Sequence, residues 1–124
     1  MANKRKTIVI ADDEKSVRAL VKRFLEDKYI VLEASDGEEA VNLARTQKPD
    51  LILMDIMMPK VDGYVACSII KTDPTTREIP VVMLTGVDHE LNVKFSQDLG
   101  ASGYITKPFN VDEVLCQVKQ ALGE

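Results

Sequence analysis

The most informative segment of the chain reads Leu51-Ile52-Leu53-Met54, four apolar residues in a row, with the carboxylate of Asp55 directly after them. An unbroken apolar run of this length is typical of a strand that is buried on both faces of a parallel sheet. Short β-branched runs of similar length occur at residues 7–11, 29–32, 80–84 and 103–105. The run at 29–32 leads into Glu33 and is therefore predicted to be a less buried strand at an edge of the sheet.

Segments of helical length lie between these runs. The first carries apolar residues along one helix face, namely Val17, Leu20, Val21, Phe24 and Leu25. The last carries a similar stripe, made of Val111, Val114, Leu115, Val118 and Leu122. Asn110 is well placed to cap the start of this last helix, and Gly123 to follow its end.

Turn and capping residues place the remaining helices. Asp36, with Glu39 three residues later, predicts the start of a second helix. Asp62-Gly63 predicts the start of a third, which ends before Asp73-Pro74. A fourth helix, over about residues 88–99, has the weakest apolar stripe. Such a stripe favours a helix that is less firmly buried and better able to shift.

Alternating strands and helices predict right-handed β-α-β units and an open parallel sheet with helices on both faces. With five strands in a chain of 124 residues, the expected fold is a flavodoxin-like doubly wound α/β sandwich with strand order 2-1-3-4-5. No repeat, low-complexity segment or linker-like stretch interrupts the sequence. Residues 1–124 are therefore expected to form a single domain.

The composition argues against several classes of function. The net charge is −4 and the only basic cluster is Lys4-Arg5-Lys6, so binding of nucleic acid is not expected. No apolar run approaches the roughly 18 residues that a membrane-spanning helix needs, and no secretory signal is expected. Cys67 and Cys116 stand in no metal-binding or CxxC pattern and are expected to be reduced thiols at core or boundary positions. These features predict a cytoplasmic protein.

Polar residues stand where the predicted strands end, which is where doubly wound sheets bind their ligands. Asp12 and Asp13 follow the first strand, the third strand ends in Asp55, Thr85 closes the fourth and Lys107 follows the fifth. In the predicted strand order the first and third strands are neighbours, so the three aspartates are expected to share one pocket. Carboxylates this close repel one another unless a cation lies between them, and Mg²⁺ prefers such oxygen ligands.

Such a pocket suits phosphoryl transfer to an aspartate. An aspartate carboxylate can act as a nucleophile and carry a phosphoryl group covalently. Transfer then needs little more than positioning and neutralisation of the charge on the transferred oxygens. Mg²⁺, the ammonium group of Lys107 and the hydroxyl group of Thr85 are expected to contact those oxygens. Lys107 is also expected to pair with Asp55 or with a phosphate oxygen.

Each of these residues has a simpler interpretation when taken alone. An Asp-Asp pair after a strand, such as Asp12-Asp13, is more often a helix cap than a metal site. Asp55 alone could belong to a turn, and Thr85-Gly86 and Lys107-Pro108 alone are an ordinary strand exit and an ordinary turn. Their joint occurrence at neighbouring strand ends favours the metal and phosphate interpretation.

The whole chain resembles the receiver domain of bacterial two-component response regulators. The resemblance rests on Asp12-Asp13, the segment Asp55-Ile56-Met57-Met58-Pro59-Lys60-Val61-Asp62-Gly63, Thr85-Gly86 and Tyr104-Ile105-Thr106-Lys107-Pro108. Each piece is a weak signal, but four in order at matching strand ends are specific. The resemblance implies a bound Mg²⁺ ion and phosphorylation of one aspartate in the cytoplasm of a bacterium.

The resemblance also implies a role for each acidic residue. Asp55 would be the phosphoacceptor. Asp13 and Asp55 would bind Mg²⁺ directly, Asp12 at least partly through water, and the backbone carbonyl of Met57 would complete the metal site. A receiver catalyses its own phosphorylation and slow dephosphorylation, and the chain is not expected to be a turnover enzyme.

The phosphoryl-binding side of the site is implied in the same way. Thr85 and Lys107 would contact the phosphoryl oxygens, and Gly86 would leave room for the phosphoryl group. The bond between Lys107 and Pro108 is expected to be cis, an isomer that X-Pro bonds adopt at low cost. Tyr104 would be a switch aromatic that turns inward as Thr85 moves toward the phosphate.

The implied partners are proteins. The phosphoryl donor would be a sensor histidine kinase or a histidine phosphotransfer protein, and an output protein would bind the surface of the fourth helix, fifth strand and fifth helix. The chain would act as a monomer or a phosphorylation-dependent dimer, with no output domain in residues 1–124, no nucleic acid and no membrane. Two apolar residues near the site, Met57 and Val87, predict a comparatively long-lived phosphoryl group.

Three alternative functions remain open at this point. A flavin-binding electron carrier of the same fold needs a phosphate cradle after the first strand, where Asp12-Asp13-Glu14 would repel a phosphate. A Mg²⁺-dependent phosphohydrolase of the haloacid-dehalogenase type would, by resemblance, carry its nucleophile directly after the first strand, whereas Asp55 lies on the third. A degenerate receiver that acts only as a protein-interaction module would lack part of the site, and no part is missing.

Overall fold

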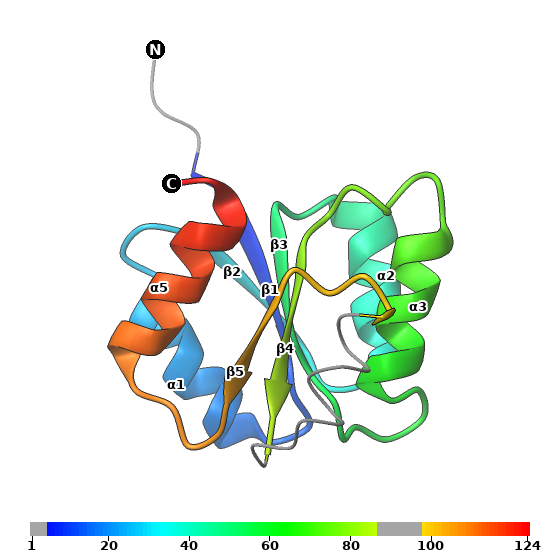
Figure 1. Ribbon diagram of the computed structural model, residues 1–124. Coiled ribbons are helices and arrows are strands. Elements are labelled where there is room, and N and C mark those ends of the chain that lie inside the picture. Colours follow the sequence, from blue (N-terminus) through cyan, green and yellow to red (C-terminus); the bar gives the residue numbers. More distant parts are fainter. Residues whose placement is uncertain (1–4, 87–97) are drawn as a thin grey trace.

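The computed structural model describes residues 5–86 and 98–124, and Figure 1 shows how their elements are arranged. Five parallel strands form one sheet in the order β2-β1-β3-β4-β5, as the sequence predicts. The strands are β1 (Thr7–Ala11), β2 (Ile30–Ala34), β3 (Leu51–Asp55), β4 (Val81–Thr85) and β5 (Gly103–Thr106). The order reverses between β1 and β3, so the switch point lies at the carboxyl ends of these two strands.

Helices cover both faces of this sheet. The described helices are α1 (Lys15–Leu25), α2 (Gly37–Gln47), α3 (Gly63–Thr72) and α5 (Val111–Leu122). In Figure 1, α1 and α5 lie on one side of the sheet and α2 and α3 on the other. The predicted fourth helix, over about residues 88–99, falls almost entirely outside the described residues, and so does Val87.

Two hydrophobic clusters lie on the two faces of the sheet, and they explain the unbroken apolar runs. In β1, Val9 and Ala11 pack with α2 and α3, whereas Ile8 and Ile10 pack with α1 and α5. Every residue of β3 is buried. Because helices cover both faces, neither set of alternating residues along the length of a central strand faces solvent, and both sets are largely apolar up to the carboxyl end of the strand. The edge strand β2 is more exposed, as predicted.

Side-chain caps begin three of the described helices at the predicted residues. The side-chain oxygens of Asp36, Asp62 and Asn110 each accept a hydrogen bond from the backbone N–H three residues later, at 2.8 or 2.9 Å. Each bond satisfies an N–H group that the first turn of a helix leaves unpaired. Gly123 follows α5 with a φ of 74°, and α3 ends at Thr72. These local signals therefore place the helix ends correctly.

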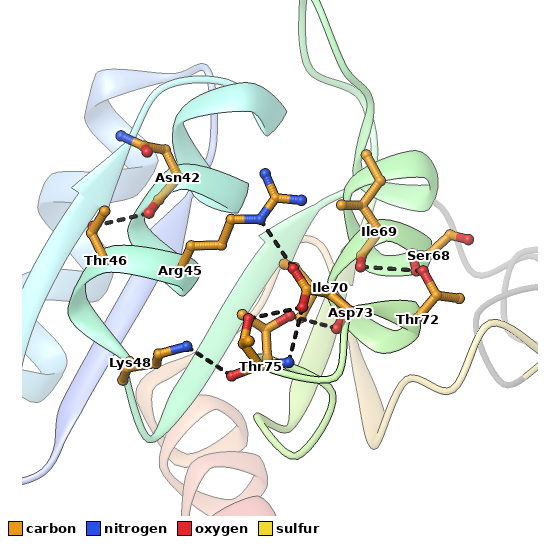
Figure 2. Close-up of polar contacts among 11 residues, drawn as sticks. Asn42, Arg45, Thr46, Lys48, Ser68, Ile69, Ile70, Thr72, Asp73 and Thr75 are labelled. Atoms are coloured by element: carbon orange, nitrogen blue, oxygen red, sulfur yellow. Dashed lines mark hydrogen bonds and ion pairs between the residues drawn. The ribbon is translucent and has the colours of Figure 1, made fainter.

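Polar contacts also fasten α2 to the turn that follows α3, as Figure 2 shows. The Nε of Arg45 donates to the carboxylate of Asp73 at 3.2 Å, and the Nζ of Lys48 donates to the backbone carbonyl of Thr75 at 2.9 Å. Asp73 in turn accepts from the backbone N–H and hydroxyl of Thr75. Both helices end at the edge of the sheet opposite to the strand carboxyl ends. These contacts therefore stabilise the end of the fold that is remote from the predicted site.

Three details of the predicted packing are wrong. Leu20 is 43% exposed and Val111 is 38% exposed, although the spacing predicts both on buried helix faces. Leu20 lies at the border of the buried face of α1, which contains Val21 and Leu25. Val111 is the first residue of α5, so no preceding helical turn covers its side chain. Cys116 is exposed, whereas Cys67 is fully buried as expected.

Polar residues end three of the strands. Asp55 and Thr85 are the last residues of β3 and β4, as predicted, and Thr106 extends β5 by one residue beyond the predicted run. Polar groups at the site are therefore held by sheet hydrogen bonding as well as by the loops. Among the helices of residues 5–86 and 98–124, none has the length and apolar character needed to cross a bilayer.

Candidate functional site

The carboxyl ends of β1 and β3 bring the predicted aspartates together. Ala11 of β1 pairs with Met54 of β3, so Asp12 follows one strand beside Asp55 at the end of the other. Asp12, Asp13 and Asp55 each offer a carboxylate oxygen, and these oxygens lie within 4.8 Å of one another. Asp12 is fully buried and Asp55 is 5% exposed, whereas Asp13 is open to solvent. The three residues form a small acidic pocket with one side chain facing water.

Lys107 enters this pocket from the other side. Its Nζ donates to Oδ2 of Asp12 at 2.8 Å and to Oδ1 of Asp55 at 3.3 Å. It follows β5, which β4 separates from β3 in the sheet. The predicted pairing with Asp55 is confirmed, but sequence reasoning missed the shorter contact to Asp12. The bond between Lys107 and Pro108 is cis, as predicted.

The charges in this pocket do not balance. Burial and the neighbouring carboxylate of Asp12 raise the pKa of Asp55 from its ordinary value of 3.8 to about 6, and Lys107 offsets only part of this shift. Burial alone would lower the pKa of Lys107, but its contacts with Asp12 and Asp55 outweigh burial and raise it. The three carboxylates therefore carry more negative charge than Lys107 neutralises. An additional cation with oxygen ligands would relieve this excess.

The donor set of the pocket fits Mg²⁺. The clustered ligands are carboxylates, with no thiolate or imidazole among them. Hard oxygen ligands suit Mg²⁺, whereas zinc and copper sites are built mainly from sulfur and imidazole. The exposed carboxylate of Asp13 leaves the pocket accessible to an ion from solvent.

The helix-cap interpretation of the acidic pair is wrong. The residue that precedes α1 in extended conformation is Glu14, and its side chain makes no cap hydrogen bond. Asp12 uses Oδ1 to accept from the backbone N–H of Glu14 at 2.9 Å and Oδ2 to accept from Lys107. Its own backbone N–H donates to the carbonyl of Ala34 at 3.0 Å. These bonds direct the acidic side chain into the pocket and not onto the helix end.

The loop after β3 depends on a glycine that sequence reasoning treated only as the start of a helix. The backbone N–H of Gly63 donates to the carbonyl of Ile56 at 2.8 Å. A Cβ on Gly63 would overlap the carbonyl oxygen of Asp55 and lie 2.8 Å from the Cα of Ile56. Only glycine therefore lets α3 pack this closely against the backbone of the acidic residue.

Replacing Gly63 with alanine is expected to destabilise the protein by about 1–3 kcal/mol, because a backbone overlap must be relieved. Alanine at an ordinary helix position would instead stabilise the protein by up to about 1 kcal/mol. Chemical denaturation measures the difference. Gly86→Ala is the matched control, since an added Cβ there meets no heavy atom of the described residues within 4 Å. Equal stability of the two variants would contradict the close approach at Gly63.

The other predicted residues lie around this core of the site. Thr85 ends β4, which lies between β3 and β5, and Gly86 follows it. The side chain of Met57 is 78% exposed in the loop after β3, and Tyr104 on β5 is 37% exposed. The structure thus brings Asp12, Asp13, Asp55 and Lys107 into one cluster. The side chains of Met57 and Tyr104 are instead exposed, in the loop after β3 and on β5.

A comparison with known protein families identifies this arrangement. Residues 8–119 match the model of the response regulator receiver domain family. The chain belongs to this family. Receiver domains are switches of signal transduction, and they bind Mg²⁺ at a cluster of acidic residues of the kind formed here by Asp12, Asp13 and Asp55. The family match argues against a flavin-binding electron carrier and against a phosphohydrolase.

This receiver domain is similar to parts of longer proteins. It is 43% identical over 118 residues to the alkaline phosphatase synthesis transcriptional regulatory protein PhoP of Bacillus subtilis. The aligned region covers 94% of this chain and 48% of that protein. The chain spans about half the length, or less, of the curated relatives it matches. The relatives include transcriptional regulators and a histidine kinase.

Solved structures have the same fold. The chemotaxis response regulator CheY4 of Vibrio cholerae has a TM-score of 0.90 and 28% identity, over 96% of this chain and 100% of that chain. The receiver domain of a sensor histidine kinase of Pseudomonas aeruginosa has a TM-score of 0.89 and 27% identity, over 98% of this chain and 100% of that chain. A magnesium ion is coordinated in the active site cleft of that kinase receiver. The predicted flavodoxin-like fold is confirmed.

Proposed function

We propose that this receiver domain accepts a phosphoryl group on Asp55 in a two-component phosphorelay. The observation that carries the proposal is the pocket, in which a nearly buried acceptor carboxylate lies beside two other carboxylates and a lysine that bridges Asp12 and Asp55. Membership of the receiver family supports the same function. The donor would be the phosphohistidine of a sensor histidine kinase or of a histidine phosphotransfer protein.

The metal site would be built from oxygen ligands. Asp13 and Asp55 would bind Mg²⁺ directly, Asp12 at least partly through water, and Met57 would contribute its backbone carbonyl. When bound, Mg²⁺ would neutralise the carboxylates and stabilise negative charge on the phosphoryl oxygens. The excess negative charge that raises the pKa of Asp55 is what such an ion would offset.

Phosphoryl transfer would use Asp55 as the nucleophile. One carboxylate oxygen attacks phosphorus, a P–O bond forms as the P–N bond to the donor imidazole breaks, and the imidazole leaves with that electron pair. With a pKa of about 6, Asp55 is mostly ionised at neutral pH and needs no general base. Lys107 would move from Oδ1 of Asp55 onto a phosphoryl oxygen and keep its shorter contact to Asp12. Thr85 would hydrogen-bond another oxygen, and Gly86 would leave room for the group.

The signal would pass to a protein partner through β5, α5 and the predicted fourth helix. A groove of about 420 Å³ lies between β5 and α5, and Tyr104, Thr106 and Cys116 are among the residues that line it. An inward turn of Tyr104, which is 37% exposed, would reshape this groove. We propose residues 1–124 as one receiver domain, acting in the cytoplasm as a monomer or a phosphorylation-dependent dimer. It would act as a switch and not as a turnover enzyme.

Release of phosphate from a small phosphodonor, such as acetyl phosphate, tests this function in the presence of Mg²⁺. A receiver takes up one phosphoryl group per chain and then releases phosphate only as fast as the isolated phosphoprotein decays. Sustained release that is faster than this decay would instead show a phosphohydrolase.

Replacing Met57 with asparagine is expected to hasten loss of the phosphoryl group by roughly threefold to tenfold. The side chain of Met57 is 78% exposed two residues after Asp55, and it offers no strong hydrogen bond to an attacking water. An asparagine amide at this place could orient that water, with an effect the size of one hydrogen bond. The decay of the phosphoprotein, followed by intact mass, measures the rate, and Met57→Leu is the control. An unchanged or slower decay would contradict this role of position 57.

A further inference from the structure

An arginine of α1 contacts the backbone between the two acidic residues. Arg18 lies with only 15% of its side chain exposed. Its Nη1 donates to the backbone carbonyl of Asp12 at 2.8 Å, and its Nε donates to Oε1 of Glu33 at 3.1 Å. Sequence reasoning assigns neither residue a role in the site, because an arginine on a surface helix is ordinary and Glu33 serves only as the sign of a less buried edge strand.

We propose that Arg18 is a positioning residue for the metal-binding loop and that Glu33 holds it in place. The inference rests on the proposed function, because it concerns how the loop of Asp12 and Asp13 presents carboxylates to Mg²⁺. Arg18 does not itself touch the metal ligands' carboxylate oxygens in the contacts described. It acts through the peptide group that joins the two acids.

The other polar groups of Asp12 are already fixed. Its N–H donates to the carbonyl of Ala34, Oδ1 accepts from Glu14 and Oδ2 accepts from Lys107. The carbonyl is the remaining backbone group of Asp12, and Arg18 is its donor. Hydrogen bonds therefore hold the backbone N–H and carbonyl of Asp12 as well as both of its carboxylate oxygens.

The carbonyl of Asp12 belongs to the planar peptide group that leads into Asp13. Because this group is planar and cannot rotate about its C–N bond, a hydrogen bond to its oxygen also fixes the positions of the N and Cα atoms of Asp13. The side chain of Asp13 is exposed, and its direction depends on this backbone more than on packing. Arg18 thus sets the direction from which the exposed carboxylate approaches the ion.

The chemistry of the pair suits this role. A guanidinium group has several N–H donors in one rigid plane, so Arg18 can serve two acceptors in different directions at the same time. A lysine would offer its charge at one nitrogen only. Glu33 also balances the positive charge of Arg18, which would otherwise oppose binding of a cation nearby. This gives Glu33, an exposed acid of the edge strand β2, a function in the site.

Binding of Mg²⁺, measured by isothermal titration calorimetry, tests the inference without requiring phosphorylation. Arg18→Lys keeps the charge but replaces the two separate donor nitrogens, Nε and Nη1, with a single one, so at least one of the two contacts is expected to be lost. The double variant Arg18→Ala, Glu33→Gln removes both members of the pair and leaves the net charge unchanged. Arg23→Ala, which removes an exposed arginine from the same helix, is the control. Circular dichroism and thermal unfolding without metal show whether each variant is folded.

Both Arg18 variants are expected to be folded and to bind Mg²⁺ about threefold to tenfold more weakly, the size of one lost hydrogen bond. At saturating Mg²⁺ their phosphorylation by acetyl phosphate should return to nearly the wild-type rate, and Arg23→Ala should bind like wild type. Mg²⁺ affinity within twofold of wild type, with or without a lower unfolding temperature, would overturn the inference and leave Arg18 a structural residue only. A wild-type protein that binds no Mg²⁺ would overturn the proposed function as well.

Discussion

Asp55→Asn is expected to make the metal-free protein more stable at about pH 7.5, by about 2–3 kcal/mol. Burial and the charge of Asp12 raise the pKa of Asp55 in the folded protein to about 6, from an ordinary value of 3.8. The folded state therefore holds the Asp55 proton more tightly than the unfolded state does. An ionised Asp55 consequently lowers the free energy of unfolding, and asparagine removes that charge.

The sign of this effect fixes a pH window. Protonated Asp55 contributes its full stability below about pH 4, and this contribution is lost as the pH rises through about 6. Over that window the wild type should lose stability relative to Asp55→Asn, and above it the difference should stay constant. Urea denaturation in EDTA at a series of pH values measures the difference.

Asp27→Asn is the matched control for this experiment, because it removes an equal charge from an exposed position. Its stability should stay within about 0.5 kcal/mol of wild type at every pH. Addition of Mg²⁺ should stabilise the wild type more than Asp55→Asn, because the ion favours the state to which it binds. An Asp55→Asn variant no more stable than wild type, or with the same pH dependence, would show that the pocket is not strained by excess charge.

Lys107→Met is expected to destabilise the metal-free protein by about 2–4 kcal/mol at neutral pH. Lys107 donates to Asp12 at 2.8 Å and to Asp55 at 3.3 Å. The carboxylate of Asp12 is fully buried, so removing its ammonium partner leaves a charge without compensation in the interior. Methionine keeps most of the length of the lysine side chain, and the loss therefore reflects charge more than volume.

The metal offers a second test of this prediction. Because Mg²⁺ would take over part of the neutralisation, the ion should stabilise Lys107→Met more than it stabilises the wild type. Lys119→Met, at an exposed position of α5, is the control and should lose less than about 1 kcal/mol. Equal losses in the two variants would mean that the Lys107 contacts do not hold the pocket together.

The fold could be predicted from the sequence because its signals are local. Apolar runs buried on both faces mark the central strands, and Asp36, Asp62 and Asn110 mark helix starts through side-chain caps. The strand order then follows from the handedness and length of the connections. The exposure of Leu20 could not be predicted, because a helical stripe shows which side is apolar but not how wide the contact is.

The site could be predicted in its composition but not in its pairings. The strand order alone places Asp12 beside Asp55. The shorter contact of Lys107 with Asp12, and the contact of Arg18 with the Asp12 carbonyl, depend on how loops far apart in the sequence meet. Gly63 is required by a backbone approach that no single-sequence pattern shows, because a glycine after Asp62 already has an explanation as a helix start.

Intact-mass spectrometry after incubation with acetyl phosphate tests the central claim most directly. The wild type and Asp55→Asn are compared, each with Mg²⁺ and with EDTA. One added phosphoryl group on the wild type, present only with Mg²⁺ and absent from Asp55→Asn, is the result predicted for a receiver that is phosphorylated on Asp55. An adduct that persists in Asp55→Asn would identify a different acceptor. No adduct on a folded wild type that binds Mg²⁺ would contradict the phosphorelay function and indicate a module that only binds partners.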